Sequence, residues 1–413
     1  MKIAIIGSGI AGNTLAHHLY REHDITVFEA GDHIGGHTDT HLIEHQGRQY
    51  AVDTGFIVFN DRNYPQFTRL LHEIGVQSQP SHMSFSVRCE KSGLEYNGTN
   101  LNSLFAQRRN LLRPEFYRMI RDILHFNKNS LELLADGPEI TLGDYLSKKK
   151  YGRAFIDYYI IPMGSAIWST NAGQMLSFPA RFFVRFFHNH GMLSIDNRPQ
   201  WRVIEGGSAS YVKVLTAPFK HRVRLNTPVA KVRRSPQAVH ITPVNAAEET
   251  FDWVFFACHS DQALQLLSDA SQQENEILGA IPYQENSVYL HSDIRMLPKR
   301  KLAWAAWNYH VTDEPAERVA VTYNMNILQG LEAKEPLLVT LNHTQNIDPA
   351  KVIKRLTYHH PLYTTAGVKA QARHAEISGI NRTAYCGAYW GNGFHEDGVV
   401  SALTALQHFR RAI

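Results

Sequence analysis

The chain opens with a short apolar run that is followed at once by closely spaced glycines. Residues 2–6 read Lys-Ile-Ala-Ile-Ile, which suits a strand buried on both faces of a parallel sheet. Residues 13–21 carry apolar side chains on one side and predict a helix, and residues 25–28 predict a second strand that ends at Glu29. Strand, glycine turn, helix, strand and acid follow one another in the order of a dinucleotide-binding fold.

Each glycine of the turn has a physical role in such a fold. Gly7 permits a tight turn, Gly9 lets a diphosphate approach the backbone, and Gly12 lets the helix pack close to the strand. The helix N-terminus offers N–H groups to the phosphates, and Glu29 can accept hydrogen bonds from ribose hydroxyls. The alternative, a glycine turn in another kind of α/β unit, does not explain the acid after the second strand.

The alternation of strand and helix stops near residue 80, which indicates an inserted domain. Before that point, residues 64–74 predict a helix ended by Gly75, and after it residues 83–89 and 94–96 predict a hairpin. Residues 103–150 are then helical in pattern.

The stretch 178–187 holds five phenylalanines together with Arg181 and Arg185. We interpret it as a buried helix with two exposed arginines. The alternative is a face that meets a membrane surface, where aromatic rings sit at the interface and arginines meet lipid phosphates.

Strand patterns return after residue 205 and fall into two groups. Parallel-sheet strands are predicted at 221–225 and 251–257, with a turn and strand at 227–232 and a helix through Leu267. A second group alternates apolar and polar positions and predicts antiparallel strands at 287–291, 302–309, 319–325 and 337–341. Near the end, a strand at 383–387, a loop at 388–398 and a helix at 399–409 are expected.

Composition limits the classes of protein that this chain can be. It has 413 residues, 44% of them hydrophobic and 19% charged, and a net charge of +4. The charge is too small to argue for a nucleic-acid partner, although a local basic face could meet a membrane. Three separated cysteines form no metal pattern, so a reduced cytoplasmic setting is expected, with the inner membrane face as an alternative location.

The residues that continue from Glu29 resemble a known group of flavoproteins. Gly35-Gly36-His37-Thr38, together with the later Asp53-Thr54-Gly55-Phe56, is similar to the flavin-containing amine oxidase superfamily. That superfamily includes monoamine oxidases, protoporphyrinogen oxidase and carotenoid desaturases, and usually has Arg where this chain has His37. The resemblance implies FAD as cofactor, with His37 either donating a hydrogen bond to the cofactor or, less expectedly, tethering it covalently.

The resemblance extends to both ends of the chain. The C-terminal loop with Trp390, Gly393-Phe394 and Glu396 to Gly398 is similar to the superfamily segment whose helix N-terminus faces the flavin ring. The cofactor-binding residues that we predict are Gly7, Gly9, Ile10, Ala11, Gly12, Glu29, Ala30, Gly35, Gly36, His37, Thr38, Gly55, Phe56, Val229, Gly387, Glu396, Asp397 and Gly398. No metal site is expected.

The implied fold is α/β, with a Rossmann-like FAD-binding domain assembled from separate segments. We assign residues 1–80, 205–275 and 375–413 to this domain. Residues 81–204 and 276–374 form the substrate domain, an α+β unit of antiparallel sheet and helices. Only one dinucleotide fingerprint is present, so substrate is expected to reduce the flavin, and oxygen, a quinone or an electron-acceptor protein to reoxidise it.

The substrate is expected to be a small molecule or a lipid. Many amine oxidases of the superfamily place a Lys near the flavin, and residues 285–291 supply none. Segments 304–309 and 323–326 further resemble a bacterial branch of predicted NAD/FAD-binding proteins tied to lipid modification. We therefore favour an apolar, acyl-chain-like substrate, with cavity candidates Trp304, Tyr323, Trp390 and Phe394. The alternatives are a small amine as substrate, a non-catalytic FAD-binding scaffold for a lipid-modifying enzyme, and an NAD-dependent dehydrogenase.

Overall fold

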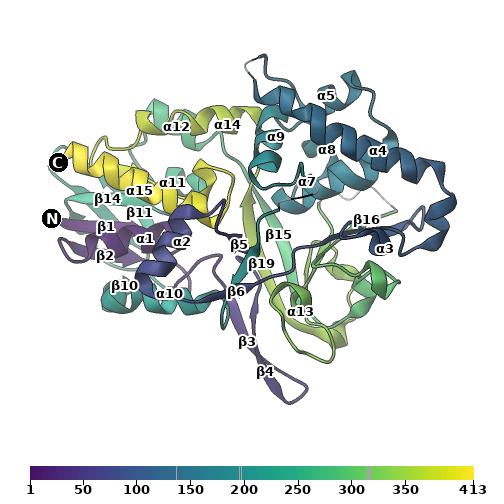
Figure 1. The fold of residues 1–413 in the computed structure, drawn as a ribbon. Helices are drawn as coiled ribbons and strands as arrows, with labels where there is room; N and C mark the ends of the chain where they lie inside the picture. Colours follow the sequence, from purple (N-terminus) through teal and green to yellow (C-terminus); the bar gives the residue numbers. More distant parts are fainter. Residues whose placement is uncertain (136, 195, 197, 314–317) are drawn as a thin grey trace.

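The computed structural model describes residues 1–413 except residues 136, 195, 197 and 314–317. Its first layer is a five-stranded parallel sheet at the side where both chain ends lie (Figure 1). The strands, in spatial order, are β10 (Val223–Arg224), β2 (Asp24–Phe28), β1 (Lys2–Ile6), β14 (Trp253–Phe256) and β20 (Thr383–Tyr385). Their apolar residues point to both faces, because helices or a second sheet cover each face.

Two helices from opposite ends of the chain cover one face of this sheet. Helix α1 (Ile10–Leu19) packs against α15 (His395–Ala412), and their apolar sides share a core with β1 and β14. Figure 1 shows the yellow α15 lying alongside the purple α1. The other face carries β11 (Val229–Arg234), β12 (Val239–Pro243), β13 (Glu249–Phe251), α11 (Ser260–Leu266), α12 (Gln272–Leu278) and α14 (Thr365–Gln371).

The second layer is a seven-stranded sheet covered by helices. Its spatial order is β19 (Val352–Pro361), β15 (Tyr283–His291), β18 (Leu338–Leu341), β17 (Val321–Asn324), β16 (Trp307–Val311), β7 (Phe85–Cys89) and β8 (Glu95–Asn97). All neighbours are antiparallel except β16 and β7, which are parallel.

One face of the seven-stranded sheet packs against a group of helices. These are α4 (Pro114–Asn129), α5 (Leu142–Lys148), α6 (Arg153–Phe155), a π-helix (Ile156–Ile160), α7 (Ile161–Trp168), α8 (Ala172–Leu176) and α9 (Ala180–Asn189). Helix α3 (Leu101–Leu104) follows β8. The four buried phenylalanines of the 178–187 stretch lie in this core, whereas Arg185 is exposed. The buried-helix interpretation therefore holds for these rings, but only one of its two arginines is exposed. Arg181 is half-buried and donates to the Leu133 and Gly137 carbonyls, and the membrane-facing alternative stays a prediction.

Small elements connect the two layers. They are the hairpin β3 (Thr40–His45) and β4 (Arg48–Asp53), the strands β5 (Phe59–Asn60), β6 (Ser78–Pro80) and β9 (Trp201–Ile204), and the helices α2 (Pro65–Ile74), α10 (Ala209–Thr216) and α13 (Met325–Leu328). Short 3₁₀ turns complete the chain at 108–112, 130–134, 217–222, 294–296, 301–303, 344–346, 349–351, 374–376 and 388–390.

The predicted fold class, α/β with an α+β second unit, is confirmed, and several boundaries differ. Residues 301–303 form a 3₁₀ turn, so the strand expected at 302–309 begins only at Trp307. The strand expected at 221–225 is reduced to two residues. Helix α15 begins at His395, because the Asp397 carboxylate accepts a hydrogen bond from the Phe394 N–H and caps the first turn. The domain boundaries themselves stay a prediction.

Candidate functional site

The glycine turn lies at the carboxyl edge of the parallel sheet. Gly7 has a φ of 105°, and a Cβ there would come within 2.8 Å of the Ala257 carbonyl oxygen. A Cβ on Gly12 would overlap the Gly7 carbonyl. At Gly9, by contrast, an added Cβ would meet no described atom within 4 Å. The backbone beside Gly9 therefore borders open space at the N-terminus of α1, as a bound diphosphate requires.

Glu29 is fixed at the end of β2 by its own neighbours. Its carboxylate accepts hydrogen bonds from the Ser8 N–H (2.9 Å), the Ser8 hydroxyl (2.5 Å) and the Gly31 N–H (2.8 Å). A carboxylate has about four lone-pair sites, so acceptor capacity remains for a ribose hydroxyl. The segment before Val229 runs beside it, since Thr227 donates its N–H to the Glu29 carbonyl (2.8 Å).

The second glycine pair abuts the first. Gly36 has a φ of 58°, and its Cβ position lies 3.3 Å from the Gly9 Cα. Gly55 packs on the carbonyl of His37, to which Phe56 donates its N–H (2.7 Å). Three segments that the sequence separates therefore meet at one place on the sheet edge.

The two ends of the chain meet at the same place. A Cβ on Gly398, in the first turn of α15, would lie 2.6 Å from the Ile10 Cγ2 in the first turn of α1. Both helices therefore direct their N-terminal N–H groups and positive dipole ends to this region. His395 is buried there, with its Nε2 2.9 Å from the Thr38 hydroxyl and 2.8 Å from the Tyr211 hydroxyl.

The two acidic residues of α15 use their side chains within the protein. Glu396 accepts the N–H groups of Gln66 and Phe67 at 3.0 and 2.9 Å and so caps α2. Asp397 caps its own helix, and burial raises its pKa to about 6. The backbone N–H groups of these two residues lie in the first turn of α15, where a helix leaves N–H groups free for a cofactor. Gly387 donates its N–H to the Ser401 hydroxyl (2.9 Å) on α15, and Ala30 is exposed beside Glu29.

Asp53 is a buried carboxylate that ties three segments together. It accepts hydrogen bonds from the Thr40 hydroxyl, from the N–H and hydroxyl of Ser208, and from the Gln329 side-chain amide, at 2.5 to 3.1 Å. Burial raises its pKa to about 6 even though these donors favour the ionised form. The sequence indicated this residue only as the first member of the Asp53-to-Phe56 segment.

A group of four imidazoles was not anticipated from the sequence. This histidine cluster consists of His37, His259, His359 and His360. The His37 ring centre lies 5.5 Å from that of His360 and 6.1 Å from that of His259, and His259 lies 6.5 Å from His359. His259 follows the carboxyl end of β14, and His359 and His360 come from β19. Three elements thus bring imidazoles to the edge that holds Gly9 and Gly36.

The four predicted cavity residues lie in different surroundings. Phe394 stacks on Phe186 of α9, with ring centres 5.3 Å apart. Tyr323 is buried in the core under the seven-stranded sheet, in edge contact with Trp307. Trp390 packs against His374, on the face of the parallel sheet that β11, β12 and α12 cover.

Trp304 is not brought to the cofactor edge. Its indole N–H donates to the Pro298 carbonyl (2.8 Å), and its carbonyl accepts from the Asn97 side chain at β8. Strand β8 is one edge of the seven-stranded sheet, whereas β19, which carries the histidines, is the opposite edge. Residues 301–304 instead turn to cover the β8 edge, and the cavity role of Trp304 stays a prediction.

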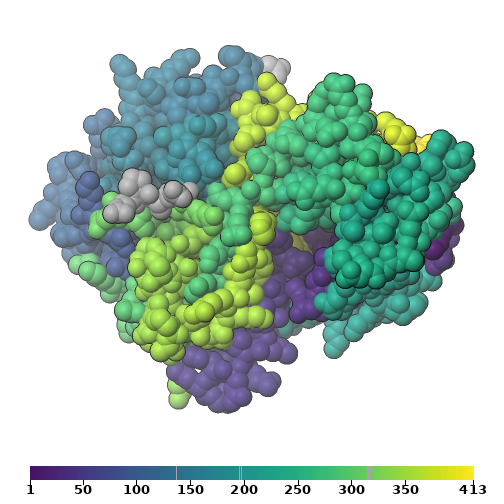
Figure 2. Space-filling view, turned by 180° about the vertical axis from the view of Figure 1, so that it is seen from behind, coloured from purple at the N-terminus to yellow at the C-terminus, as the bar shows by residue number. Residues whose placement is uncertain are grey.

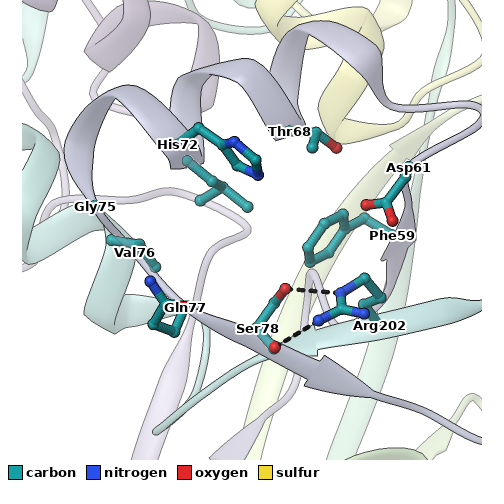
Figure 3. Close-up of a pocket in the computed structure, with 10 residues that line it drawn as sticks. Phe59, Asp61, Thr68, His72, Gly75, Val76, Gln77, Ser78 and Arg202 are labelled. Atoms are coloured by element: carbon teal, nitrogen blue, oxygen red, sulfur yellow. Dashed lines mark hydrogen bonds between the residues drawn. The ribbon is translucent and has the colours of Figure 1, made fainter.

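The surface has two features that bear on access. Figure 2 shows a hollow on the rear face, at the floor of which the purple N-terminal segment is visible between green and teal segments. A separate cavity of about 680 Å³ lies between α2, β6 and β9, where Arg202 donates to the hydroxyl and carbonyl of Ser78 (Figure 3). Its lining residues include none of the predicted cofactor residues.

Two other kinds of feature are absent from the described residues, namely a metal site and a membrane-spanning helix. Outside the seven residues without description, no three His, Cys, Asp or Glu side chains are arranged to hold a metal ion. Among the helices that the structure describes, none is long and apolar enough to cross a membrane. Cys89, Cys258 and Cys386 are not in disulfides.

Gly7, Gly9, Gly12 and Gly36 form a glycine cradle whose open backbone at Gly9 fits a diphosphate. This cradle and the fold, together with the family match that follows, define a flavin-dependent oxidoreductase with FAD as its cofactor. A model of the family described as flavin containing amine oxidoreductase matches residues 10–289. The chain therefore belongs to the flavin containing amine oxidoreductases. Among curated proteins, none matches this chain.

Solved structures with the same fold belong to proteins that are named for different reactions. A protein from Exiguobacterium sp. 255-15 with the provisional description of a protoporphyrinogen oxidase is 19% identical, with a TM-score of 0.72 over 100% of this chain and 99% of that one. Cyclohexylamine oxidase from Brevibacterium oxydans IH-35A is 12% identical, with a TM-score of 0.70 over 99% of each chain. A CLA-producing fatty acid isomerase from P. acnes is 15% identical, with a TM-score of 0.65 over 98% of each chain. At these identities the likeness shows the fold.

Proposed function

We propose that this enzyme oxidises an apolar, acyl-chain-like substrate. The observation that carries the proposal is an aromatic cluster formed by Trp168, Phe182, Phe186, Tyr363 and Phe394. Phe394 and Phe186 stack at 5.3 Å, Phe182 and Tyr363 stack at 5.3 Å, and Trp168 lies 4.8 Å from Phe186. Because Phe394 immediately precedes α15, this cluster reaches the helix N-terminus of the cofactor cradle.

The polar groups of the aromatic cluster favour a substrate with a polar end. The buried Tyr363 hydroxyl and the Trp168 indole N–H find no hydrogen-bond partner among the described residues. A Cβ on Gly393 would lie 2.6 Å from that hydroxyl, so the hydroxyl borders the loop before α15. A buried donor without a partner is costly, and the carboxyl or ester group of a lipid would satisfy it.

The residues of this chain position and desolvate the substrate. The aromatic walls exclude water and hold the reacting C–H bond, and the helix N-termini of α1 and α15 favour negative charge at the cofactor. FAD, held at Gly9 and Gly36, would supply the two-electron acceptor for this oxidation, with oxygen, a quinone or a protein as the terminal acceptor. The fatty acid isomerase of the same fold supports the proposal, because its description names an acyl substrate.

A small amine is the second candidate substrate. The family match and the cyclohexylamine oxidase of the same fold favour it. Against it, β15 carries no Lys, the residue that many amine oxidases of the superfamily place near the flavin.

Anaerobic mixing separates the two candidates. The holoenzyme is mixed with unsaturated phospholipid, free fatty acid or a panel of amines, and the visible absorbance of the oxidised flavin is followed. We expect bleaching by the lipid or the fatty acid. Phe394→Ala should slow this reduction by roughly tenfold or more, because positioning is lost. Tyr117→Ala, which removes an exposed aromatic ring on α4, should leave it unchanged. Bleaching by amines alone would reject the proposal, and bleaching by no compound would favour a scaffold.

A further inference from the structure

The histidine cluster stands beside the place where the diphosphate of FAD is bound. His37 directly follows Gly36, whose Cβ position lies 3.3 Å from the Gly9 Cα. His259 follows the end of β14, the strand next to β1 and its glycine turn. Ligands of open parallel sheets bind at this carboxyl edge. A diphosphate held at Gly9 therefore lies within one residue of the His37 backbone.

The Nε2 atom of His37 has no internal partner. It is inaccessible to solvent and makes no hydrogen bond with any described residue. A buried imidazole nitrogen without a partner is costly unless a ligand supplies one. The phosphate oxygens are acceptors, so a ligand of that kind suits an imidazole that carries a proton on this nitrogen.

The surroundings of His37 keep its ring neutral in the chain without cofactor. Burial, reinforced by repulsion from His259 and His359, lowers the pKa of His37 to about 4. Burial likewise lowers the pKa of His259 to about 4 and that of His360 to about 3. At neutral pH the rings of His37, His259 and His360 are therefore uncharged.

The charged and titratable groups that face His37 come from four elements. They are His259 before α11, Tyr358, His359 and His360 on β19, Asp39 beyond the glycine pair, and His395 on α15. Asp39 is the one acid among them, and its carboxylate already accepts the Tyr358 hydroxyl (2.8 Å) and lies 3.3 Å from the His41 Nε2. Two further charged groups act on His37 indirectly. A Glu285 carboxylate oxygen lies 3.8 Å from the His359 Nε2, and the Lys354 Nζ lies 2.8 Å from the Nδ1 of His41, the neighbour of Asp39.

We propose that His37 takes up a proton when FAD binds, so that the cofactor diphosphate is held in part by a titratable cation. The two phosphate charges are permanent at neutral pH, and an opposite charge close by favours the protonated imidazole. Proton uptake makes affinity depend on pH. Between the pKa of His37 in the free protein and its higher value in the complex, the association constant falls up to tenfold for each unit rise in pH. Above the pKa that His37 has in the complex, the association constant no longer changes with pH.

The test counts protons during FAD binding to the apoprotein. Isothermal titration at one pH in two buffers of different ionisation enthalpy gives the number taken up, which should approach one near pH 6. His37→Gln should remove the uptake and weaken binding most at low pH. His37→Arg supplies a permanent charge and should bind FAD with an affinity that no longer varies with pH. His33→Gln, which removes a neighbouring exposed imidazole, is the matched control and should keep the wild-type uptake.

A second measurement does not require the apoprotein. Release of FAD from the diluted holoprotein, followed by its fluorescence, should be greater at pH 8 than at pH 6 for wild type and equal at both for His37→Arg. Zero proton uptake by the wild type would overturn the proposal. Undiminished uptake by His37→Gln would also overturn it, because another histidine of the cluster would then carry the proton. Neither readout depends on the identity of the substrate.

Discussion

Removing the charge of Asp53 should change how the stability of the protein depends on pH. Asp53 is fully buried, and its pKa rises from 3.8 to about 6 because burial outweighs the donors around it. An acid whose folded-state pKa is raised stabilises the fold below the unfolded pKa. That stability is lost as pH rises through the folded pKa. The unfavourable contribution at pH 7 is about 3 kcal/mol, since each pKa unit corresponds to about 1.4 kcal/mol.

The substitution Asp53→Asn isolates this contribution. Both proteins are unfolded in urea as apoproteins at several pH values, and the difference in their free energies of unfolding is plotted. The variant should gain about 2 kcal/mol relative to wild type between pH 4.5 and pH 7. Comparing the two proteins is necessary because the buried histidines act in the opposite sense. Their lowered pKa values make the fold more stable as pH rises.

The absolute stability of the variant is a separate quantity. An asparagine keeps one acceptor oxygen but turns an amide N–H₂ toward the donors of Ser208 or Gln329, which should cost about 1–3 kcal/mol at every pH. That cost shifts the whole difference curve without changing its slope. A difference that stays constant from pH 4.5 to pH 7 would refute the reasoning, because Asp53 would then titrate alike in folded and unfolded chains.

Two further substitutions test the cradle and its support. Gly9→Ala should leave the thermal midpoint of the apoprotein unchanged, because the added Cβ meets no described atom. It should weaken FAD binding by roughly tenfold or more, since the methyl group occupies the space of the diphosphate. A lowered thermal midpoint of the apoprotein would contradict this reasoning. Glu396→Ala should lower the free energy of unfolding by about 1–2 kcal/mol in urea, because α2 loses the acceptor for its Gln66 and Phe67 N–H groups; an unchanged value would show that water replaces this cap.

The cofactor cradle could be predicted because its signals are local. Gly7, Gly9 and Gly12 are closely spaced within one strand–turn–helix unit, so their roles could be predicted although the Ala257 carbonyl that restricts Gly7 follows the distant β14. The resemblance predicted that Gly35 and Gly36 bind the cofactor, but the contact of Gly36 with Gly9 was found only in the structure.

The histidine cluster could not be predicted because it depends on a strand that left little pattern. β19 is the edge strand of its sheet, and exposed side chains such as Lys354 and Arg355 hide the alternation expected of a half-buried strand. Its register with β15, which places His360 opposite Gln284, is a long-range pairing. The start of the strand expected at 302–309 was misplaced for a similar reason, since only the tertiary structure shows that residues 301–304 cover the β8 edge.

The contact between Gly398 and Ile10 has a consequence for how the enzyme is made in the cell. A ribosome synthesises the glycine turn almost four hundred residues before the first turn of α15 that packs against it. The nascent chain must therefore wait with an unfinished nucleotide pocket, and flavin loading becomes a late event in biogenesis. Ribosome-bound chains halted before residue 395 should consequently contain no bound flavin and show no flavin absorbance.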